Sequence, residues 1–337
     1  MSATHQLSLN EIKRLAVSAL LAAGATQLQA EPLAAAITAA EADGIASHGL
    51  AYLPTYCEHL RCGKVDGKAV PVVTKPKPAL IAVDAQTGFA HLAIDAGFEA
   101  LIPLAREFGI AGMSVRNSYN CGVLGYHTER LAAAGLLGLG FTNAPASIAP
   151  FGGKKAVVGT NPFAIAAPDG KGGAAISIDQ SASVIAKSEV MRRKRAGASI
   201  PEGWAFGPDG EATTDPEIAL KGTMAPSGGY KGFGAGLMVE LLAAAASGAV
   251  LAMDASPFSG TAGGPPKTGQ FFVAIDVAAS SGGGFGERVT KLVEAIVAQP
   301  GAHVPGAKRK AARVHLASGV SVSSDLVTQI QALAAPR

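Results

Sequence analysis

The chain has 337 residues, of which 48% are hydrophobic, so it can bury a large core in two or three lobes. Its net charge of +3 is too small to indicate nucleic-acid binding, and only 16% of its residues are charged. The three cysteines form no CxxC pair or zinc spacing and no apolar leader opens the chain, so we expect a cytoplasmic protein without a metal site.

Helical signals dominate the first 72 residues. Ser8 followed by Glu11 has the form of a capping box, which predicts a first helix. Apolar spacing predicts a second helix over about 31–42 and a third over 53–62. Glycines and prolines then end the helical pattern. We therefore predict a helical N-terminal segment over residues 1–72.

Short apolar segments alternate with helical patterns between residues 73 and 302, which predicts an α/β domain built on a sheet. A glycine-rich turn starting at residue 228 should open a long helix. The other expected elements are strands over 79–85, 111–117, 138–144, 159–168, 172–183 and 263–277, and helices over 91–108, 125–134 and 285–297.

Two further segments complete the chain. The apolar stretch 236–253 carries Glu240, so we interpret it as a buried helix and not as a membrane span. Residues 303–337 contain a basic run at 307–313, which suits either a solvated face or an anion site, and end in a predicted helix. We expect this C-terminal segment to pack back on the N-terminal helices, and we expect no membrane or nucleic-acid partner.

The first candidate for chemistry is the Ser47-His48 step, which follows the second predicted helix. An imidazole can give or take a proton near neutral pH, and a neighbouring hydroxyl can fix its tautomer. A histidine at a helix end can also simply bond a carbonyl group. From the residues alone, this plainer interpretation is favoured.

Three other segments are candidate ligand loops. Polar residues and glycines at 117–127 lie between a strand and a helix, where backbone N–H groups can bind phosphate. Cys121 has no activating base at a diagnostic spacing, so we expect a buried, inert thiol. The turn at 159–162 suits a ligand contact, and Lys231 in a glycine-rich helix start suits an anion. Each segment also fits a purely structural turn.

The sequence has no GxGxxG fingerprint, P-loop, HExxH or GxSxG motif. However, "DGIASHGLAYLPTY", "VDGKAVPVV", "GTNPFAIAAP", "IPEGWAFGPDGEATTDP", "GGYKGFGAGLMVELL" and "KTGQFFVAID" occur in this order. This series resembles the malate/L-lactate dehydrogenase family, which also includes sulfolactate and ureidoglycolate dehydrogenases, diketogulonate reductase and reductases of Δ1-pyrroline-2-carboxylate and Δ1-piperideine-2-carboxylate. The likeness extends from about residue 8 to 335.

The resemblance implies a non-Rossmann α/β fold, with a mixed central sheet and a helical lobe formed by both chain ends. It also implies a homodimer that uses NAD or NADP, with NADPH slightly favoured. The implied activity is hydride transfer between nicotinamide and C2 of a small 2-oxo/2-hydroxy acid of the malate, lactate or sulfolactate type. Reduction of a cyclic imino acid is the alternative, and an inactive nicotinamide-binding sensor is a third possibility.

Site residues follow from the same resemblance. His48 would donate the proton, Ser47 would orient it, and Glu189 stands where the imine reductases have an aspartate that completes the relay. Tyr52 and Thr160 would contact the substrate. Lys308 or Arg309 could favour the additional phosphate of NADP. The residues expected to line the cofactor are Asn120, Cys121, Gly122, Val123, Leu124, Asp179, Gln180, Ser181, Tyr230, Lys231, Gly306, Lys308 and Arg309.

Two positions depart from the family pattern. The family often has an arginine four residues after the histidine, where it would pair with the substrate carboxylate, and this chain has Tyr52. The family often has a histidine in its SNHFG motif, and this chain has Asn120. Because tyrosine cannot replace a bidentate arginine, carboxylate recognition must come from elsewhere or the substrate differs.

Overall fold

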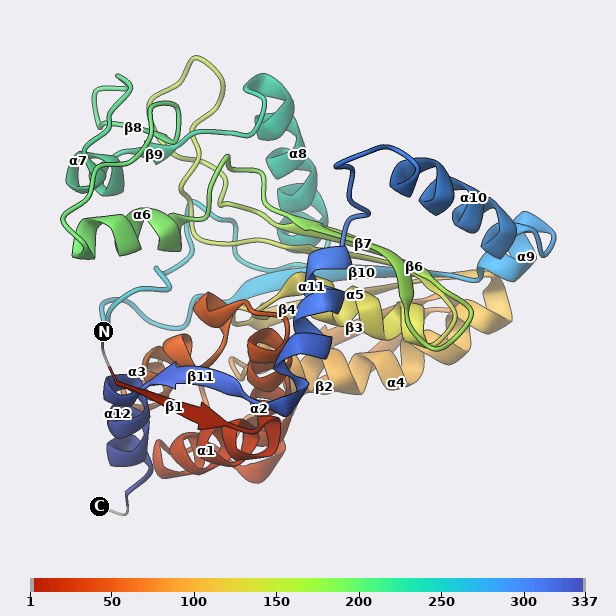
Figure 1. Cartoon of the computed structure of the whole chain (residues 1–337), viewed down its shortest axis with the longest axis horizontal. Helices are drawn as coiled ribbons and strands as arrows, with labels where there is room; N and C mark the ends of the chain where they lie inside the picture. The colour runs from red at the N-terminus through yellow and green to blue at the C-terminus, as the bar shows by residue number, and fades with distance from the viewer. Residues whose placement is uncertain (1–2, 336–337) are drawn as a thin grey trace.

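The computed structural model describes residues 3–335 and is built on a seven-stranded mixed sheet (Figure 1). Only the neighbours β3 and β4 run parallel, and every other pair is antiparallel. The fold class predicted from the sequence is therefore confirmed. In spatial order the strands are β2 (Val72–Lys77), β3 (Leu80–Asp84), β4 (Ile110–Ser118), β10 (Thr268–Ile275), β5 (Leu137–Thr142), β6 (Phe163–Pro168) and β7 (Ala174–Gln180).

Helices cover the sheet on two sides (Figure 1). Helix α4 (Ala90–Phe108) packs on β3 and β4, and α5 (Leu124–Ala133) packs on β5 and β6. Helix α8 (Tyr230–Glu240) and the π-helical turn after it pack on β5 and β10 from the opposite side. Helix α10 (Phe285–Val297) contacts β7, and its bounds match the predicted helix.

The N-terminal lobe contains α1 (Leu9–Ala22), α2 (Gln27–Ala42) and α3 (Leu53–Arg61). The predicted capping box is present, because Ser8 and Glu11 bond each other's backbone N–H. Helix α2 begins four residues earlier than predicted. The reason is tertiary: the buried Gln29 side chain donates to the carbonyl of residue 69 at 2.7 Å and accepts from the N–H of residue 89 at 3.0 Å.

Both chain ends build this lobe. Strand β1 (Thr4–Leu7) pairs antiparallel with β11 (Val320–Ser323), and α12 (Ser324–Ala334) packs on α1 and α3. One hydrophobic core contains Ile12 and Leu33 from the N-terminal helices together with Val322 and Ile330 from the C-terminal end. The helical lobe formed by both ends, expected from the resemblance, is therefore observed.

Several short elements gave no clear sequence signal. They are small or exposed, so they carry little apolar periodicity; the edge strand β2, for example, is exposed along its whole length. The unpredicted elements are β1, β2, β8 (Ala205–Phe206), β9 (Thr223–Met224), β11, α6 (Lys187–Arg195), α7 (Pro216–Lys221), α9 (Val277–Ser281) and α11 (Ala307–His315).

The prediction of one buried helix over residues 236–253 is wrong. Helix α8 continues only through the turn Leu241–Ala245, and Gly248, with φ +67°, then reverses the chain. Glu240 stabilises this reversal because its buried carboxylate accepts the N–H of Ala252 at 2.6 Å. Within residues 3–335, no helix combines the length and apolarity needed to span a bilayer.

Replacing Phe272 by alanine should lower the free energy of unfolding by about 3–5 kcal/mol. Phe272 is fully buried on the central strand and packs edge-on against Phe98, with ring centroids 5.2 Å apart. Denaturant unfolding checks this loss. Val314→Ala is the control, because Val314 is 80% exposed and its truncation should change stability by no more than about 0.5 kcal/mol.

Candidate active site

The Ser-His step forms a tight 3-10 turn, Ala46–His48, immediately after α2. Ser47 Oγ lies 3.1 Å from His48 Nδ1, so the hydroxyl contacts one ring nitrogen. His48 is partly exposed, and burial of its ring lowers its pKa below the ordinary value of 6.5. The turn therefore presents an imidazole whose orientation is fixed from one side.

The buried carboxylate of Glu41 stabilises this turn through a hydrogen bond. Glu41, in the last turn of α2, accepts the N–H of Leu50 through Oε1 at 2.7 Å. A β-carbon on Gly49 would lie only 2.2 Å from the same oxygen. Burial raises the pKa of the Glu41 carboxyl. Glycine thus follows Ser-His because any side chain there would collide with Glu41.

Beside the turn, three side chains hold the loop 257–260. The Tyr52 hydroxyl donates to one of its carbonyls at 3.2 Å, His59 Nε2 to another at 3.0 Å, and the buried Lys64 amine to a third at 2.7 Å. Tyr52 also packs edge-on against Tyr56, with centroids 4.8 Å apart. The position that often carries arginine in the family is therefore part of an aromatic wall.

The loop 120–124 is linked to this wall. Asn120 Oδ1 accepts from the Tyr56 hydroxyl at 3.2 Å and from the N–H of Gly122 at 2.9 Å. Gly122 has φ +68°, which favours glycine there. The predicted buried thiol is confirmed, since Cys121 is buried and burial raises its pKa to about 12. Val123 and Leu124 are buried where α5 begins.

Two buried histidines lie beneath this loop, and sequence reasoning did not identify them. His127 Nε2 donates to the carbonyl of Cys121 at 2.9 Å, and the His91 ring lies 5.6 Å from the His127 ring. Burial lowers the pKa of His91 to about 3 and that of His127 well below its ordinary value. Both rings are therefore neutral at physiological pH and support the loop without charge.

A surface pocket of about 480 Å³ adjoins the Ser-His turn. It brings together four residues that the resemblance assigns to the cofactor: Asp179, Gln180, Gly306 and Arg309. Ile45, two residues before Ser47, also lines it. The remaining lining residues are Ser177, Ile178 and Pro305.

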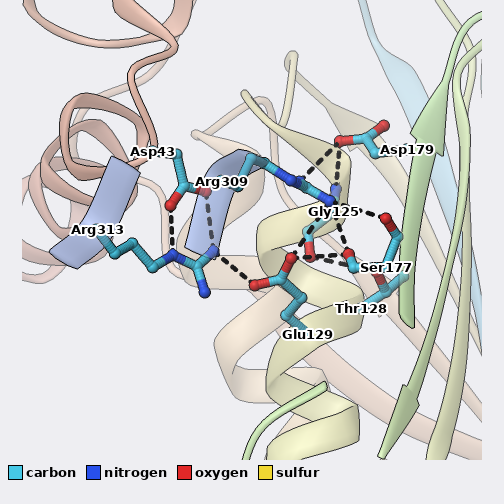
Figure 2. Close-up of polar contacts among 8 residues, drawn as sticks. All are labelled: Asp43, Gly125, Thr128, Glu129, Ser177, Asp179, Arg309 and Arg313. Atoms are coloured by element: carbon cyan, nitrogen blue, oxygen red, sulfur yellow. Dashed lines mark hydrogen bonds and ion pairs between the residues drawn. The ribbon is translucent and has the colours of Figure 1, made fainter. Parts of the chain in front are cut away.

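Hydrogen bonds and ion pairs connect the residues along one wall of this pocket (Figure 2). Arg309 donates to Ser177 Oγ at 2.7 Å and lies 3.3 Å from Glu129 and 3.8 Å from Asp179. Asp179 in turn accepts the N–H of Gly125 at 2.7 Å, and burial raises its pKa. The guanidinium of Arg309 is therefore already paired, whereas Lys308 beside it is exposed.

Glu189 lies on α6, and its carboxylate binds cations of its own helix. It pairs with Arg192 at 2.6 Å and Arg193 at 3.3 Å, and the hydrogen bond from Arg192 lowers its pKa to about 2. Within residues 3–335, no hydrogen bond or ion pair joins Glu189 to His48. Its place in a proton relay remains a prediction.

The other predicted residues lie outside the pocket lining. Half-buried Thr160 accepts the N–H of Ala182 through its carbonyl at 2.8 Å, and the hydroxyl of Ser181 contacts that of Ser183 at 3.0 Å. The neighbour of Thr160, Asn161, is fully buried and donates to Glu240 at 2.8 Å. Tyr230 and Lys231 are exposed at the start of α8.

Sequence reasoning also missed the roles of Glu41 and Asp43 beside the Ser-His turn and of Glu129 beside the pocket. Glu41 and Asp43 lie at the C-terminal end of α2, where the helix dipole disfavours negative charge. Acids at a helix C-terminus need stabilising partners. Their position in the sequence was therefore the available signal that other residues would contact them. The partner of Asp43 is Arg313, which is 270 residues away in the sequence.

Gly49→Ala should lower the free energy of unfolding by about 1–3 kcal/mol, because the new methyl group must displace the Glu41 carboxylate. Thermal unfolding measures the effect. Gly234→Ala is a matched control, since a β-carbon at Gly234 meets no atom within 4 Å. Equal stability of the two variants would contradict the steric role of Gly49.

Comparison with known proteins gives consistent matches over the full chain. The protein is 41% identical over 334 residues to a (2R)-3-sulfolactate dehydrogenase (NADP(+)) of Chromohalobacter salexigens, covering 99% of both chains. It is 39% identical to a Delta(1)-pyrroline-2-carboxylate reductase of Ancylobacter novellus, covering 97% of both.

The fold matches solved structures equally well. The structure of delta1-piperideine-2-carboxylate reductase from Pseudomonas syringae superposes with a TM-score of 0.93 at 33% identity, over 98% of this chain and 100% of that one. The sequence also matches the malate/L-lactate dehydrogenase family over residues 7–331. The chain therefore belongs to the malate/L-lactate dehydrogenase family.

Proposed function

We propose that this protein is an NAD(P)-dependent oxidoreductase that transfers a hydride between nicotinamide and C2 of a small 2-oxo/2-hydroxy acid of the malate, lactate or sulfolactate type. The observation that carries the proposal is the Ser47–His48 pair on a supported turn beside a pocket. The family contains dehydrogenases, and one relative at 41% identity is named as a sulfolactate dehydrogenase that uses NADP(+).

His48 is the proposed proton donor. In its protonated form, Nδ1–H donates to Ser47 Oγ, and Nε2–H is available for the substrate oxygen. After donation, the ring is neutral with its proton on Nδ1, where Ser47 holds that tautomer. In the reverse direction the free Nε2 acts as the base. Ser47 therefore orients the ring in both directions.

The pocket and loop 120–124 are the proposed cofactor site. The bound nicotinamide would supply or accept the hydride. Two glycines allow the elements around the pocket to pack closely. A β-carbon on Gly125 would lie only 2.5 Å from Arg309, and Gly306, with φ +92°, packs against Ser177. The residues proposed to hold the cofactor are Asn120, Cys121, Gly122, Val123, Leu124, Asp179, Gln180, Ser181, Tyr230, Lys231, Gly306, Lys308 and Arg309.

NADPH remains the slightly favoured cofactor. Because Arg309 is paired with Glu129 and Ser177, the exposed Lys308 is the better candidate to meet the additional phosphate of NADP. The NADP(+) named for the sulfolactate dehydrogenase relative supports this choice. The other assigned roles, substrate contact by Tyr52 and Thr160 and proton relay by Glu189, belong to the same proposal.

Reduction of a cyclic imino acid is the second candidate function. Tyr52 packs edge-on against Tyr56, and an aromatic side chain at this position offers apolar contact to a ring but no positive charge to a second carboxylate. Several relatives are named as Delta(1)-pyrroline-2-carboxylate reductases. Here His48 would protonate the ring nitrogen and hydride would reach the same C2 position.

The protein is further proposed to be a cytoplasmic homodimer. The exposed side of α8 and the following turn carries Leu237, Met238 and Leu241, and Tyr230 at the helix start packs near the exposed Phe151. Exposed apolar patches of this kind mark protein interfaces. The three cysteines are free, as expected in a reducing compartment.

We also propose the domain division 1–72, 73–302 and 303–337.

His48→Ala should lower the turnover number about 10²–10⁴-fold while cofactor affinity is retained. Loss of NADPH absorbance measures turnover, and NADPH fluorescence measures binding. Burial lowers the pKa of His48 below 6.5, and only the protonated ring can donate a proton during reduction. The wild-type reduction rate should therefore rise as the pH falls through 6.5. Turnover of the variant close to wild type would remove His48 from the mechanism.

A substrate panel with NADH and NADPH should separate the two candidate reactions. Pyruvate, oxaloacetate and sulfopyruvate test the oxo-acid activity, and Δ1-pyrroline-2-carboxylate tests the imine activity. Turnover confined to the imine would replace the first function by the second. Cofactor binding without turnover of any compound would favour the inactive sensor.

Leu241→Asp should convert a dimer into a monomer, because it places a charge in the exposed apolar patch that α8 and the turn after it form. Light scattering after size-exclusion chromatography gives the molecular mass. Leu292→Asp on α10 is the control, since Leu292 has a similar exposure, 58% against 57% for Leu241. A monomeric wild-type protein would refute the proposed dimer.

A further inference from the structure

An ion pair fixes the end of the helix that leads into the Ser-His turn (Figure 2). Asp43 is the C-cap residue of α2, and its side chain is only 3% exposed. Arg313 of α11 contacts both carboxylate oxygens, Oδ1 through Nε and Oδ2 through Nη2, the latter at 2.9 Å. This bidentate geometry holds the acid where the helix dipole would disfavour it.

The same arginine binds a second acid on the cofactor side. Arg313 Nη2 donates to Glu129 Oε2 at 2.6 Å, and Glu129 lies on α5, the helix that follows loop 120–124. The other carboxylate oxygen, Oε1, accepts from Ser177 Oγ at 2.7 Å and lies 3.3 Å from Arg309. Glu129 therefore lies between the two arginines of α11.

The interactions form one continuous chain from the pocket wall to the turn. From Asp179 they proceed through Arg309, Glu129 and Arg313 to Asp43 (Figure 2). Ile45, which lines the pocket, follows Asp43 by two residues, and its N–H bonds the carbonyl of residue 40 at 2.8 Å. Four separate elements, α2, α5, β7 and α11, thus share one set of paired charges.

We propose that Arg313 is a positioning residue that couples the occupancy of the pocket to the placement of the Ser47–His48 turn. The inference rests on the proposed function, in which the pocket holds the cofactor and His48 moves the proton. Arg313 touches neither of them. It sets the position of Asp43 at one end and of Glu129 at the other.

The physical basis is the bidentate contact that Arg313, itself 40% exposed, makes with the buried carboxylate of Asp43, which is only 3% exposed. Without Arg313, the buried carboxylate of Asp43 loses its bidentate partner and must move toward solvent. The Ser-His turn begins only three residues after Asp43, so such a movement displaces the imidazole. A displacement of about 1 Å at a reacting group can reduce a rate by up to about a hundredfold.

The test compares wild type with five variants: Arg313→Met, Arg313→Lys, Glu129→Gln, the double variant Arg313→Met/Glu129→Gln, and the control Lys310→Met. The control removes an exposed charge from the same helix. Three quantities are measured for each: the NMR resonances of the His48 ring without ligand, the dissociation constant for NADPH, and the turnover number. Arg313→Lys keeps the charge but loses the bidentate geometry, so it serves if Arg313→Met folds poorly.

We expect Arg313→Met to shift the His48 resonances, reduce turnover about tenfold and weaken NADPH binding severalfold, with Arg313→Lys intermediate and Lys310→Met unchanged. Adding Glu129→Gln to Arg313→Met should cause less loss than the product of the two single effects, because both changes break the same chain. Reduced thermal stability with His48 resonances and turnover per folded molecule unchanged would overturn the inference.

The outcome is separable from the proposed function. If wild type neither binds NADPH nor turns over any substrate of the panel, the proposed function fails. The His48 resonances then still decide the structural coupling: a shift in Arg313→Met but not in Lys310→Met supports it, and unchanged resonances overturn it.

Discussion

The whole structure depends on the hydrogen bonding of β10 between β4 and β5. This strand is antiparallel to both neighbours and joins β2, β3 and β4 to β5, β6 and β7 in a single sheet. It also fixes polar groups near the site, because Gln270 donates to the carbonyl of Tyr119 at 3.1 Å and the N–H of Gly269 donates to Asn143 at 2.8 Å. The segments that contain Tyr119 and Asn143 are therefore both hydrogen-bonded to β10.

Buried or half-buried acids provide much of the order around that site. Glu41 holds the turn that contains His48, Asp43 ties it to α11, and Glu240 holds the turn that contains Asn161. Each carboxylate accepts at least one N–H from another element, which compensates for the loss of water. These acids fix the geometry of the loops around the site through hydrogen bonds. A catalytic group carried on a loop needs such support to hold its position.

In the proposed function, substrate choice would depend on Tyr52, which stands where the family often has an arginine. Tyr52 supplies an aromatic face and a hydroxyl that already binds a loop carbonyl, so it adds no positive charge. If Tyr52 contacts the substrate as proposed, it would add apolar contact area for a cyclic substrate and provide no bidentate anion contact.

The sequence by itself determined the mixed α/β class, most long elements and the Ser-His candidate, because apolar periodicity, capping residues and serial motifs are local signals. Helix α10 and the capping box at Ser8 needed no tertiary information. Only the tertiary structure decided that Arg309 is paired and that Arg313 reaches Asp43. These partners are far apart along the chain, so the local sequence pattern can indicate that an acid at a helix end needs a partner but not which residue supplies it. It likewise decided that α8 ends early, since the Glu240 carboxylate folds the chain back through a contact with Ala252.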